Sequence, residues 1–574
     1  MTAAQRLPGR AQRIRVVRFG PARPWFEPGS VASIEVEVVA TRSSRARLAI
    51  ELLDLDQVAG QAERDVRLAA GRSRRRVEMA LPAGARRGYG LRLTIAGSDG
   101  GPLAGADAAV EALDGWWQSP RHAAVTRFAS SAATAAAVRA FRDWHVTVVQ
   151  GYDWMYRHYR YSPPPRDRLP GESFVDFLGR GVSHAAVRAG IRAGHDAGIA
   201  TLAYGSIYGA EREYVERHPD ERVFDETGRP ISLGETFYIN DLRPDRPWRR
   251  RLLAEYGMAV RRFGFDGVHM DTYGPPHNAF SAEGEVIDFA ALYPGLIADG
   301  ARAVAAARPG ARVLFNCVEG FPLEAVGDSP AAAVYLELWP PDERYADLVR
   351  WIERARTAGR GRAVVIAAYL SCLRTRGDDP AARPGAVEAV VMLTSLITTA
   401  GAYHHVLAED NRVLVEGYYP EARQLRASEA RELRAASVFG ARYVHLLTAP
   451  DAVVESADGV EVLAADGTDV PLSANPEAAA VWTRATRLAD GTRVLQLVDL
   501  RAQPDDRWDA LRAPVETATG WRVRWPGALD VVVMSPWTDS GRAQSLQVEP
   551  DGSVRLPTFR RWVVLVDRSN VSHR

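Results

Sequence analysis

The chain has 574 residues, of which 47% are hydrophobic and 25% charged, and its formal net charge is +1 at neutral pH. This length is too great for one hydrophobic core and predicts two to four domains. The balanced charge gives no basis for binding nucleic acid, and no run of about 20 apolar residues predicts a membrane span. The sequence contains no lysine, which excludes a Schiff-base mechanism through a lysine amine.

The ends and the cysteines carry little information on compartment. The N-terminus, MTAAQRLPGRAQRIRVV, lacks the apolar segment of a signal peptide. We therefore expect a cytoplasmic protein on the sequence as given, or a secreted one if a leader has been trimmed. Cys317 and Cys372 lie in apolar runs and are expected to be buried thiols rather than a disulfide.

Two regions have the alternating pattern of apolar and polar residues that is typical of antiparallel sheets. Residues 1–117 alternate apolar and polar side chains in short runs such as SIEVEVVA, ARLAIELLD and YGLRLTIAG. Gly, Pro, Asp and Ser separate these runs, a pattern that predicts a β-sandwich. The same texture returns in residues 446–574, with TRVLQLVDL, LDVVVMSP and RRWVVLVD, and predicts a second β-sandwich.

The middle region, residues 118–445, alternates strand-like runs with helical patterns. Strand-like runs occur at 123–128, 146–152, 199–204, 266–271, 311–316, 332–337, 363–369 and 402–407. Apolar residues at helical spacing lie between them, as in 187–198 and 344–356. Such alternation over roughly 300 residues predicts a (β/α)8 TIM barrel between the two β-sandwiches. A doubly wound open sheet is the alternative, but no GxGxxG follows the first strand.

Functional residues of such a barrel lie at the carboxyl ends of its strands. Asp271 ends the fourth strand-like run and Glu337 the sixth, so the two can face each other across the barrel mouth. Opposed carboxylates suit glycoside cleavage, in which one attacks and the other carries the proton. The alternative is that they hold loops or pair with arginines. Aromatic residues that could stack on sugar rings are numerous: Tyr152, Trp154, Tyr156, Tyr204, Tyr208, Tyr273, Trp339 and Tyr403.

Histidines near these positions raise the question of a metal. His269 and Asp271 are two residues apart on one strand and point the same way, which could begin a metal site. No further cluster has metal-ligand spacing, so His269 is expected to be an orienting hydrogen-bond donor, and no metal or other cofactor is predicted. His404 and His405 are adjacent and point to opposite faces; at most one enters the pocket, and His404 is the candidate for ligand contact.

Six segments together resemble motifs of glycoside hydrolase family 66, the dextranases and cycloisomaltooligosaccharide glucanotransferases. They are GYDWMYRHYRY, YGSIYGA, FDGVHMDTYG, FNCVEGF, YLELWPP and VEGYYP, in the family's order between residues 151 and 420. The resemblance implies a barrel between two β-sandwiches and retaining chemistry on α-1,6-glucan. It implies that Asp271 is the nucleophile and Glu337 the general acid/base. The substrate contacts expected around them are Tyr152, Asp153, Trp154, Tyr156, His158, Tyr204, Tyr208, His269, Asn316, Trp339, His404 and Glu416.

The sequence departs from the family's pattern near the eighth strand. Cyclising members carry a carbohydrate-binding module inserted near the end of the barrel, and here the segment before the eighth strand is too short for one. Endo-type hydrolysis of dextran or isomalto-oligosaccharides is therefore favoured. The alternatives are an α-glucan transglycosylase, an inactive carbohydrate-binding relative and a barrel enzyme of other chemistry. The run GAYHHVLAED, residues 401–410, also differs from the family's usual glycine-serine-histidine run.

Overall fold

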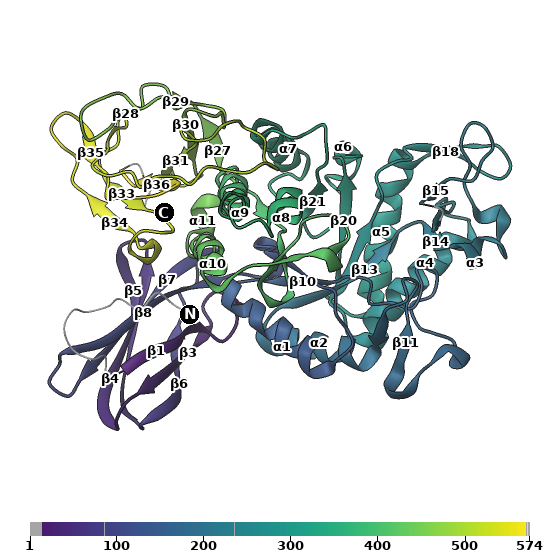
Figure 1. Cartoon of the computed structure of the whole chain (residues 1–574), viewed down its shortest axis with the longest axis horizontal. Helices are drawn as coiled ribbons and strands as arrows, with labels where there is room; N and C mark the ends of the chain where they lie inside the picture. Colours follow the sequence, from purple (N-terminus) through teal and green to yellow (C-terminus); the bar gives the residue numbers. More distant parts are fainter. Residues whose placement is uncertain (1–13, 85, 235, 570, 572–574) are drawn as a thin grey trace.

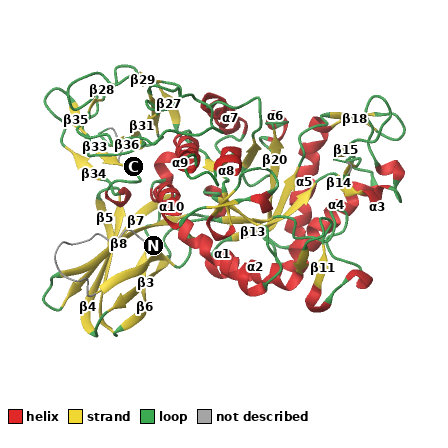
Figure 2. Cartoon of the chain, in the orientation of Figure 1, coloured by secondary structure: helices red, strands yellow, loops and turns green. Residues whose placement is uncertain are grey.

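The computed structural model describes residues 14–84, 86–234, 236–569 and 571. It is a multidomain α/β protein, with strands at both ends of the chain and a helix-covered sheet between them (Figures 1 and 2). Most of the N-terminal segment in which the sequence predicts no signal peptide lies outside the described residues. Within the described part of the chain, no helix is long and apolar enough to cross a membrane. Both cysteines are free and buried, as expected.

The N-terminal region forms two largely antiparallel sheets, in the orders β1-β3-β6 and β2-β8-β7-β4-β5, around one hydrophobic core. Ile34, Val36 and Val38 alternate along one strand and are buried in that core, as the two-residue period of a strand requires. The strands are β1 (Ile14–Pro21), β2 (Trp25–Phe26), β3 (Val31–Ala40), β4 (Ser44–Asp54), β5 (Gln57–Leu68), β6 (Gly71–Ala80), β7 (Arg87–Gly97) and β8 (Pro102–Ala112).

The middle region contains a curled, barrel-like sheet of eleven strands. Parallel strands pair in chain order: β9 (His122–Val125), β10 (Val148–Gly151), β13 (Ala200–Ser206), β17 (Gly267–Asp271), β20 (Arg312–Val318), β21 (Val334–Glu337) and β22 (Val364–Ala367). The next segment is split, because β23 (Tyr403–His404) pairs with β22 while β24 (Leu407–Ala408) pairs with β9. The sheet therefore curls back to its first strand, and β25 (Arg412–Val413) and β26 (Arg423–Gln424) extend it. Each predicted strand-like run carries an observed strand.

Helices cover the outside of this sheet (Figure 2). Their ends follow local capping: α2 begins where the Ser183 side chain accepts from the Ala186 amide and ends at Gly198, which is left-handed with φ 70°. The predicted apolar face of α7 is buried at Leu348, Ile352 and Ala355. The long helices are α1 (Ser131–Ala140), α2 (His184–Ala197), α4 (Pro247–Met258), α5 (Phe289–Ala307), α7 (Tyr345–Ala358), α9 (Arg383–Thr399) and α10 (Ala427–Arg442).

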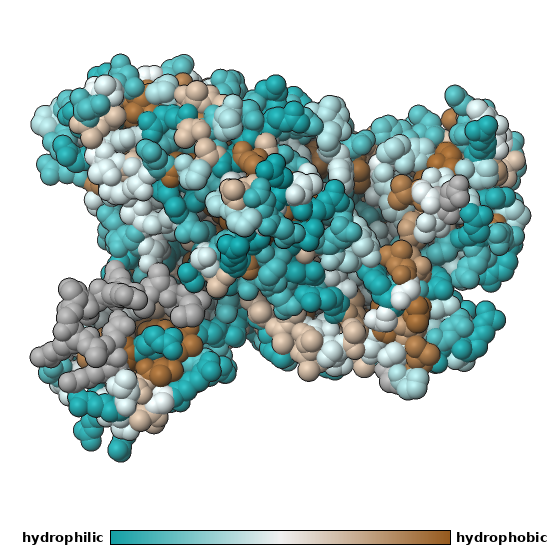
Figure 3. All heavy atoms as spheres, in the orientation of Figure 1, coloured by the Kyte–Doolittle hydropathy of each residue, from teal (hydrophilic) through white to brown (hydrophobic). Residues whose placement is uncertain are grey.

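Loops at the carboxyl ends of β10, β13 and β17 carry small extra sheets. These are β11 (Ser173–Val175) with β12 (Gly181–Ser183), β14 (Gly209–Glu211) with β15 (Ser232–Leu233) and β16 (Phe237–Ile239), and β18 (Asn278–Phe280) with β19 (Val286–Asp288). Together they form the lobe at the right of Figure 1. Brown hydrophobic patches lie over this lobe (Figure 3), where Leu169, Val175, Leu178, Leu233 and Val286 are exposed.

The C-terminal region has a sheet in the order β27-β30-β31-β36-β33-β34 and a smaller one in the order β28-β32-β35. A separate hydrophobic cluster fills it. Its strands are β27 (Val453–Glu455), β28 (Glu461–Leu463), β29 (Leu472–Ser473), β30 (Val481–Arg487), β31 (Arg493–Asp499), β32 (Arg522–Arg524), β33 (Val531–Met534), β34 (Gln544–Leu546), β35 (Ser553–Arg555) and β36 (Trp562–Asp567).

Candidate active site

The two predicted carboxylates are the last residues of parallel strands. Asp271 ends β17 and Glu337 ends β21, and both are half-buried. One strand, β20, lies between them in the sheet. Parallel strands present their carboxyl ends at one edge, so both side chains reach the same end of the curled sheet.

Asn316 on the intervening β20 joins the two carboxylates. Its side-chain Nδ2 donates to Asp271 Oδ1 at 2.7 Å and to Glu337 Oε2 at 2.6 Å. An amide NH2 has two hydrogens, so it can serve both acceptors. The two oxygens are consequently no more than about 5.3 Å apart, the two bond lengths laid end to end.

Each carboxylate also has a donor of its own. The Tyr204 hydroxyl donates to Asp271 Oδ2 at 2.9 Å. The Trp339 indole NH donates to Glu337 Oε1 at 2.9 Å. All four carboxylate oxygens therefore accept a hydrogen bond, which fixes the orientation of both groups.

The surroundings of Asp271 and Glu337 give the two carboxyl groups different pKa values. Burial raises the pKa of Asp271 to about 6, although hydrogen bonds from Asn316 and Tyr204 oppose the shift. Burial and the negative charge of Asp271 raise the pKa of Glu337 to about 7. Glu337 is thus the carboxyl that keeps its proton longer as the pH rises, while Asp271 ionises first.

Tyrosines line the space beside the carboxylates. The Tyr152 ring stacks on Tyr419 at 4.5 Å and lies 4.9 Å from the Tyr204 ring. Its hydroxyl donates to the Gly417 carbonyl at 3.1 Å. The hydroxyls of Tyr369 and Tyr419 are 3.1 Å apart. Tyr152 and Tyr204 are two of the expected substrate contacts, and Tyr419 lies beside them without having been anticipated.

A second set of charged side chains, around Asp153 and His158, lies close to Asp271. Asp153 is 4% exposed and accepts from Arg180 Nη2 at 3.1 Å. Burial raises its pKa to about 6, against the opposing charge of Arg180. His158 Nδ1 lies 3.0 Å from Glu211 Oε1, and the charge of His158 lowers the pKa of both Asp153 and Asp271. The structure therefore brings Asp153 and His158 together near Asp271; no sequence signal pointed to Arg180.

Three expected substrate contacts instead pack the core. Trp154 is fully buried, its indole donates to the Tyr204 carbonyl at 3.2 Å, and its ring lies 4.8 Å from Phe263. Tyr208 is also fully buried, and its hydroxyl accepts from the Tyr273 amide. His269 is 1% exposed, and neither ring nitrogen has a hydrogen-bond partner among the described residues. We correct the expectation for all three, since none presents a surface to a ligand.

The remaining expected contacts have partners of their own. Tyr156 donates through its hydroxyl to Asp167 at 2.6 Å, and Glu416 pairs with Arg374.

The adjacent histidines point in different directions. His404 interacts with Thr394 of α9 at 2.9 Å, so it lies against the helical layer. His405 points inward, with Nδ1 2.7 Å from the Tyr335 hydroxyl. The prediction that adjacent histidines face opposite ways is right, but the choice of His404 as the inward one is wrong.

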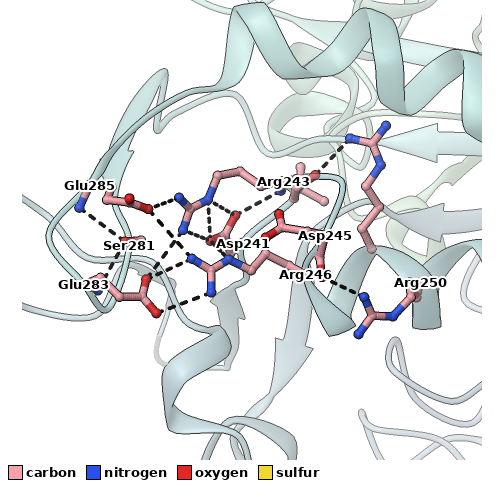
Figure 4. Close-up of polar contacts among 10 residues, drawn as sticks. Asp241, Arg243, Asp245, Arg246, Arg250, Ser281, Glu283 and Glu285 are labelled. Atoms are coloured by element: carbon pink, nitrogen blue, oxygen red, sulfur yellow. Dashed lines mark hydrogen bonds and ion pairs between the residues drawn. The ribbon is translucent and has the colours of Figure 1, made fainter.

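A cluster of ion pairs connects the hairpin that follows Asp271 to the segment before α4 (Figure 4). Asp241, whose side chain is 3% exposed, pairs with Arg243 at 2.7 Å and with Arg246 at 3.2 Å. The same arginines pair with Glu285 and Glu283 in the β18–β19 hairpin. The hairpin that follows the nucleophile candidate is thereby tied to the start of α4.

Among the described residues, no group of three or more His, Cys, Asp or Glu side chains is placed to hold a metal ion. The two carboxylates are held by neutral donors instead: Asn316, Tyr204 and Trp339.

Comparison with known proteins gives one consistent family. The model of glycosyl hydrolase family 66 matches residues 23–562. Two curated proteins of Niallia circulans, each named cycloisomaltooligosaccharide glucanotransferase, are 27% identical over 373 residues and 25% identical over 308 residues. These alignments cover 60% and 50% of this chain but only 37% and 32% of the relatives.

A solved structure is similar over nearly the whole chain. It is a cycloisomaltooligosaccharide glucanotransferase of Paenibacillus sp. complexed with cycloisomaltoheptaose, and the TM-score is 0.85. The match covers 96% of this chain and 99% of that one, at 19% identity. At this identity the likeness establishes a common fold.

Proposed function

The chain belongs to glycosyl hydrolase family 66, and on that premise we propose that it is a retaining, endo-acting hydrolase of α-1,6-glucan. Asp271 is the nucleophile, Glu337 is the general acid/base, and the substrate is dextran or an isomalto-oligosaccharide. The catalytic domain is a (β/α)8 barrel at residues 118–445, between β-sandwiches at 1–117 and 446–574.

The observation that carries this proposal is the amide of Asn316 shared by the two carboxylates. It limits the separation of the bonded oxygens to about 5.3 Å. Retaining glycosidases place their carboxyl groups about 5–5.5 Å apart, whereas inverting ones need about 6.5–9.5 Å for an intervening water. The separation therefore favours direct attack by a carboxylate over attack by water.

The order of the pKa values supports the assignment of roles. In the first step Asp271 attacks the anomeric carbon, and Glu337 donates its proton to the departing glycosidic oxygen. In the second step Glu337, now ionised, takes a proton from water as the water displaces Asp271. The lower pKa belongs to the attacking group and the higher one to the proton donor. The reaction needs no cofactor.

Transglycosylation is the second candidate. The Niallia circulans relatives are named glucanotransferases, and transfer needs only that a sugar hydroxyl replace water in the second step. Hydrolysis is favoured because only α8 (Ser371–Arg376) and short connections lie between β22 and α9, which leaves no inserted module.

The test is a product profile on dextran and isomalto-oligosaccharides. We expect shorter oligosaccharides, with the α-anomer of the new reducing end appearing first by NMR. Asp271→Ala should abolish turnover, and azide should restore it in part by forming the β-glycosyl azide. The β-anomer as first product of the wild type would refute Asp271 as nucleophile. Products longer than the substrate would assign the transfer reaction instead.

A further inference from the structure

A row of buried hydroxyl groups connects Glu337 to a histidine inside the curled sheet. The Tyr369 hydroxyl hydrogen-bonds to Glu337 and lies 3.1 Å from the Tyr419 hydroxyl. The Tyr419 hydroxyl lies 3.4 Å from that of Tyr335, which in turn is 2.7 Å from His405 Nδ1. We call the three tyrosines the tyrosine network. Each of them is at most 4% exposed, so their hydroxyls bond to one another rather than to solvent.

Separate segments of the closed sheet supply the members of this network. Tyr335 lies on β21, two residues before Glu337, so both side chains point to the same face of that strand. Tyr369 follows β22, Tyr419 lies in the loop after β25, and His405 lies between β23 and β24. The network therefore lies within the curled sheet, and Tyr335 is placed one layer below Glu337.

The Glu337 end fixes the direction in which the hydroxyls donate. An ionised carboxylate only accepts hydrogen bonds, so the Tyr369 hydroxyl donates to Glu337 when that group is charged. Each hydroxyl has one hydrogen. The oxygen of Tyr369 therefore accepts from Tyr419, and the oxygen of Tyr419 accepts from Tyr335. Every hydroxyl of the network thus directs its hydrogen toward Glu337.

His405 extends this direction as a neutral donor. Burial, together with the nearby His122 and His269, lowers the pKa of His405 well below its usual range, so the ring carries a single N–H. A hydrogen on Nε2 would be a buried donor without an acceptor among the described residues, which is costly. A hydrogen on Nδ1 instead reaches the Tyr335 oxygen at 2.7 Å. His405 therefore donates through Nδ1.

Donors that all point toward one carboxylate stabilise its ionised form. Burial raises the pKa of Glu337 to about 7, and the hydrogen bond from Tyr369 opposes that shift. Hydroxyls in series polarise one another, so the donors behind Tyr369 strengthen its bond to the carboxylate. Negative charge appears on Glu337 when it gives its proton to the leaving group. Donors that are already oriented toward it lower the energy of that step.

We propose that the tyrosine network and His405 orient Glu337 and stabilise its charged form. Tyr335 and His405 are fully buried, so they are positioning residues that act on Glu337 through Tyr419 and Tyr369. The proposal rests on the proposed function of Glu337 as general acid/base, whereas the hydrogen bonds can be tested without it.

The test is titration of the Glu337 carboxyl in the full chain by carbon NMR, with its signal assigned by its absence in Glu337→Gln. Tyr369→Phe should raise the pKa of Glu337 by about one pH unit, as expected for losing a hydrogen bond to a charged group. Tyr335→Phe should raise it less, because Tyr335 acts through two further hydroxyls. Both variants keep the aromatic ring. Asp271 and Tyr152, the other titratable groups that interact with Glu337, stay unchanged.

Tyr161→Phe is the matched control. Tyr161 is as fully buried as Tyr335, but its hydroxyl has no hydrogen bond among the described residues. The titration of Glu337 should therefore stay as in the wild type. Nitrogen NMR of the histidine rings is the second measurement, and His405 should carry its hydrogen on Nδ1.

The outcomes separate this proposal from the proposed function. An unchanged titration of Glu337 in Tyr335→Phe would overturn the network, even if the variant were less stable, and so would a His405 ring with its hydrogen on Nε2. Neither measurement needs activity. A wild type that does not cleave dextran but shows the expected shifts would refute the proposed function and support the network. An active wild type without the shifts would refute the network alone.

Discussion

At the scale of single residues, the candidate site depends on protonation. The proposed mechanism requires Asp271 ionised and Glu337 protonated, and their pKa values are about 6 and about 7. We expect kcat/KM to rise with pH through about 6, as Asp271 loses its proton, and to fall through about 7, as Glu337 does. The measurement is a pH profile on a short isomalto-oligosaccharide. A profile that is flat between about pH 5 and 9 would contradict the assignment.

Single hydrogen bonds should move the two limbs of that profile separately. Tyr204→Phe removes a donor that lowers the pKa of Asp271, so only the acidic limb should shift upward. Trp339→Phe removes a donor that lowers the pKa of Glu337, so only the alkaline limb should shift upward. Each substitution keeps an aromatic ring, which makes the two variants controls for one another. Identical shifts in both variants would contradict separate tuning.

Asn316 should affect both limbs, because its amide serves both carboxylates. Asn316→Ala should raise both pKa values and move the whole profile to higher pH. It should also lower kcat about 10- to 100-fold, since hydrogen bonds to charged groups contribute about 1.5–3 kcal/mol. A loss of activity without any shift of the profile would show that Asn316 acts on substrate binding instead.

At the scale of elements, the cluster of Figure 4 is expected to order the loop after Asp271. Asp241→Asn leaves two largely buried guanidinium groups without their shared carboxylate and should cost about 3 kcal/mol. Glu285→Gln removes a partner that is 61% exposed and should cost less than about 1 kcal/mol. Urea unfolding measures the difference, and hydrogen exchange of residues 278–288 should increase only in Asp241→Asn. Equal costs would show that the cluster is merely a surface network.

Sequence reasoning succeeds where an element's period decides the outcome. Strand alternation and the strand ends placed Asp271 and Glu337 correctly, because a parallel sheet presents one end of every strand at one edge. The alternation of side chains along a strand also predicted that His404 and His405 face opposite sides of the sheet, but it did not determine which of them faces inward. That choice follows from the pairing of β23 with β22 and of β24 with β9, which depends on the closed sheet.

Loop side chains show where that reasoning ends. Trp154 follows a strand end and looks available for a ligand, yet it packs against Phe263 and Phe265. Arg180 was not anticipated beside Asp153 because it comes from a separate segment, the turn between β11 and β12. Both placements arise from long-range packing, which carries no local signature in the sequence.

At the scale of the whole molecule, helix α10 joins the three regions (Figure 1). Arg442 at its end donates to the Ala108 carbonyl of β8 at 2.7 Å and to the Ser540 carbonyl at 3.1 Å. Arg568 of the C-terminal region also pairs with Asp56 of the N-terminal region at 2.7 Å. With charge pairs and backbone contacts across all three junctions, the regions are expected to unfold together rather than one at a time.

Gly88 in β7 gives a direct test of that coupling. A Cβ added there would lie 2.1 Å from the Ala441 carbonyl oxygen and 2.5 Å from that of Arg442, so the end of α10 would have to move away from the N-terminal sheet. Gly88→Ala should therefore destabilise the protein by about 1–3 kcal/mol. The control is Gly84→Ala, where a Cβ meets nothing within 4 Å and the change should stay within about 0.5 kcal/mol. Calorimetry should show one transition in the wild type and in Gly84→Ala, and an earlier, separate N-terminal transition in Gly88→Ala. If Gly88→Ala instead melts in one transition at the wild-type temperature, the contact between β7 and α10 does not couple the regions.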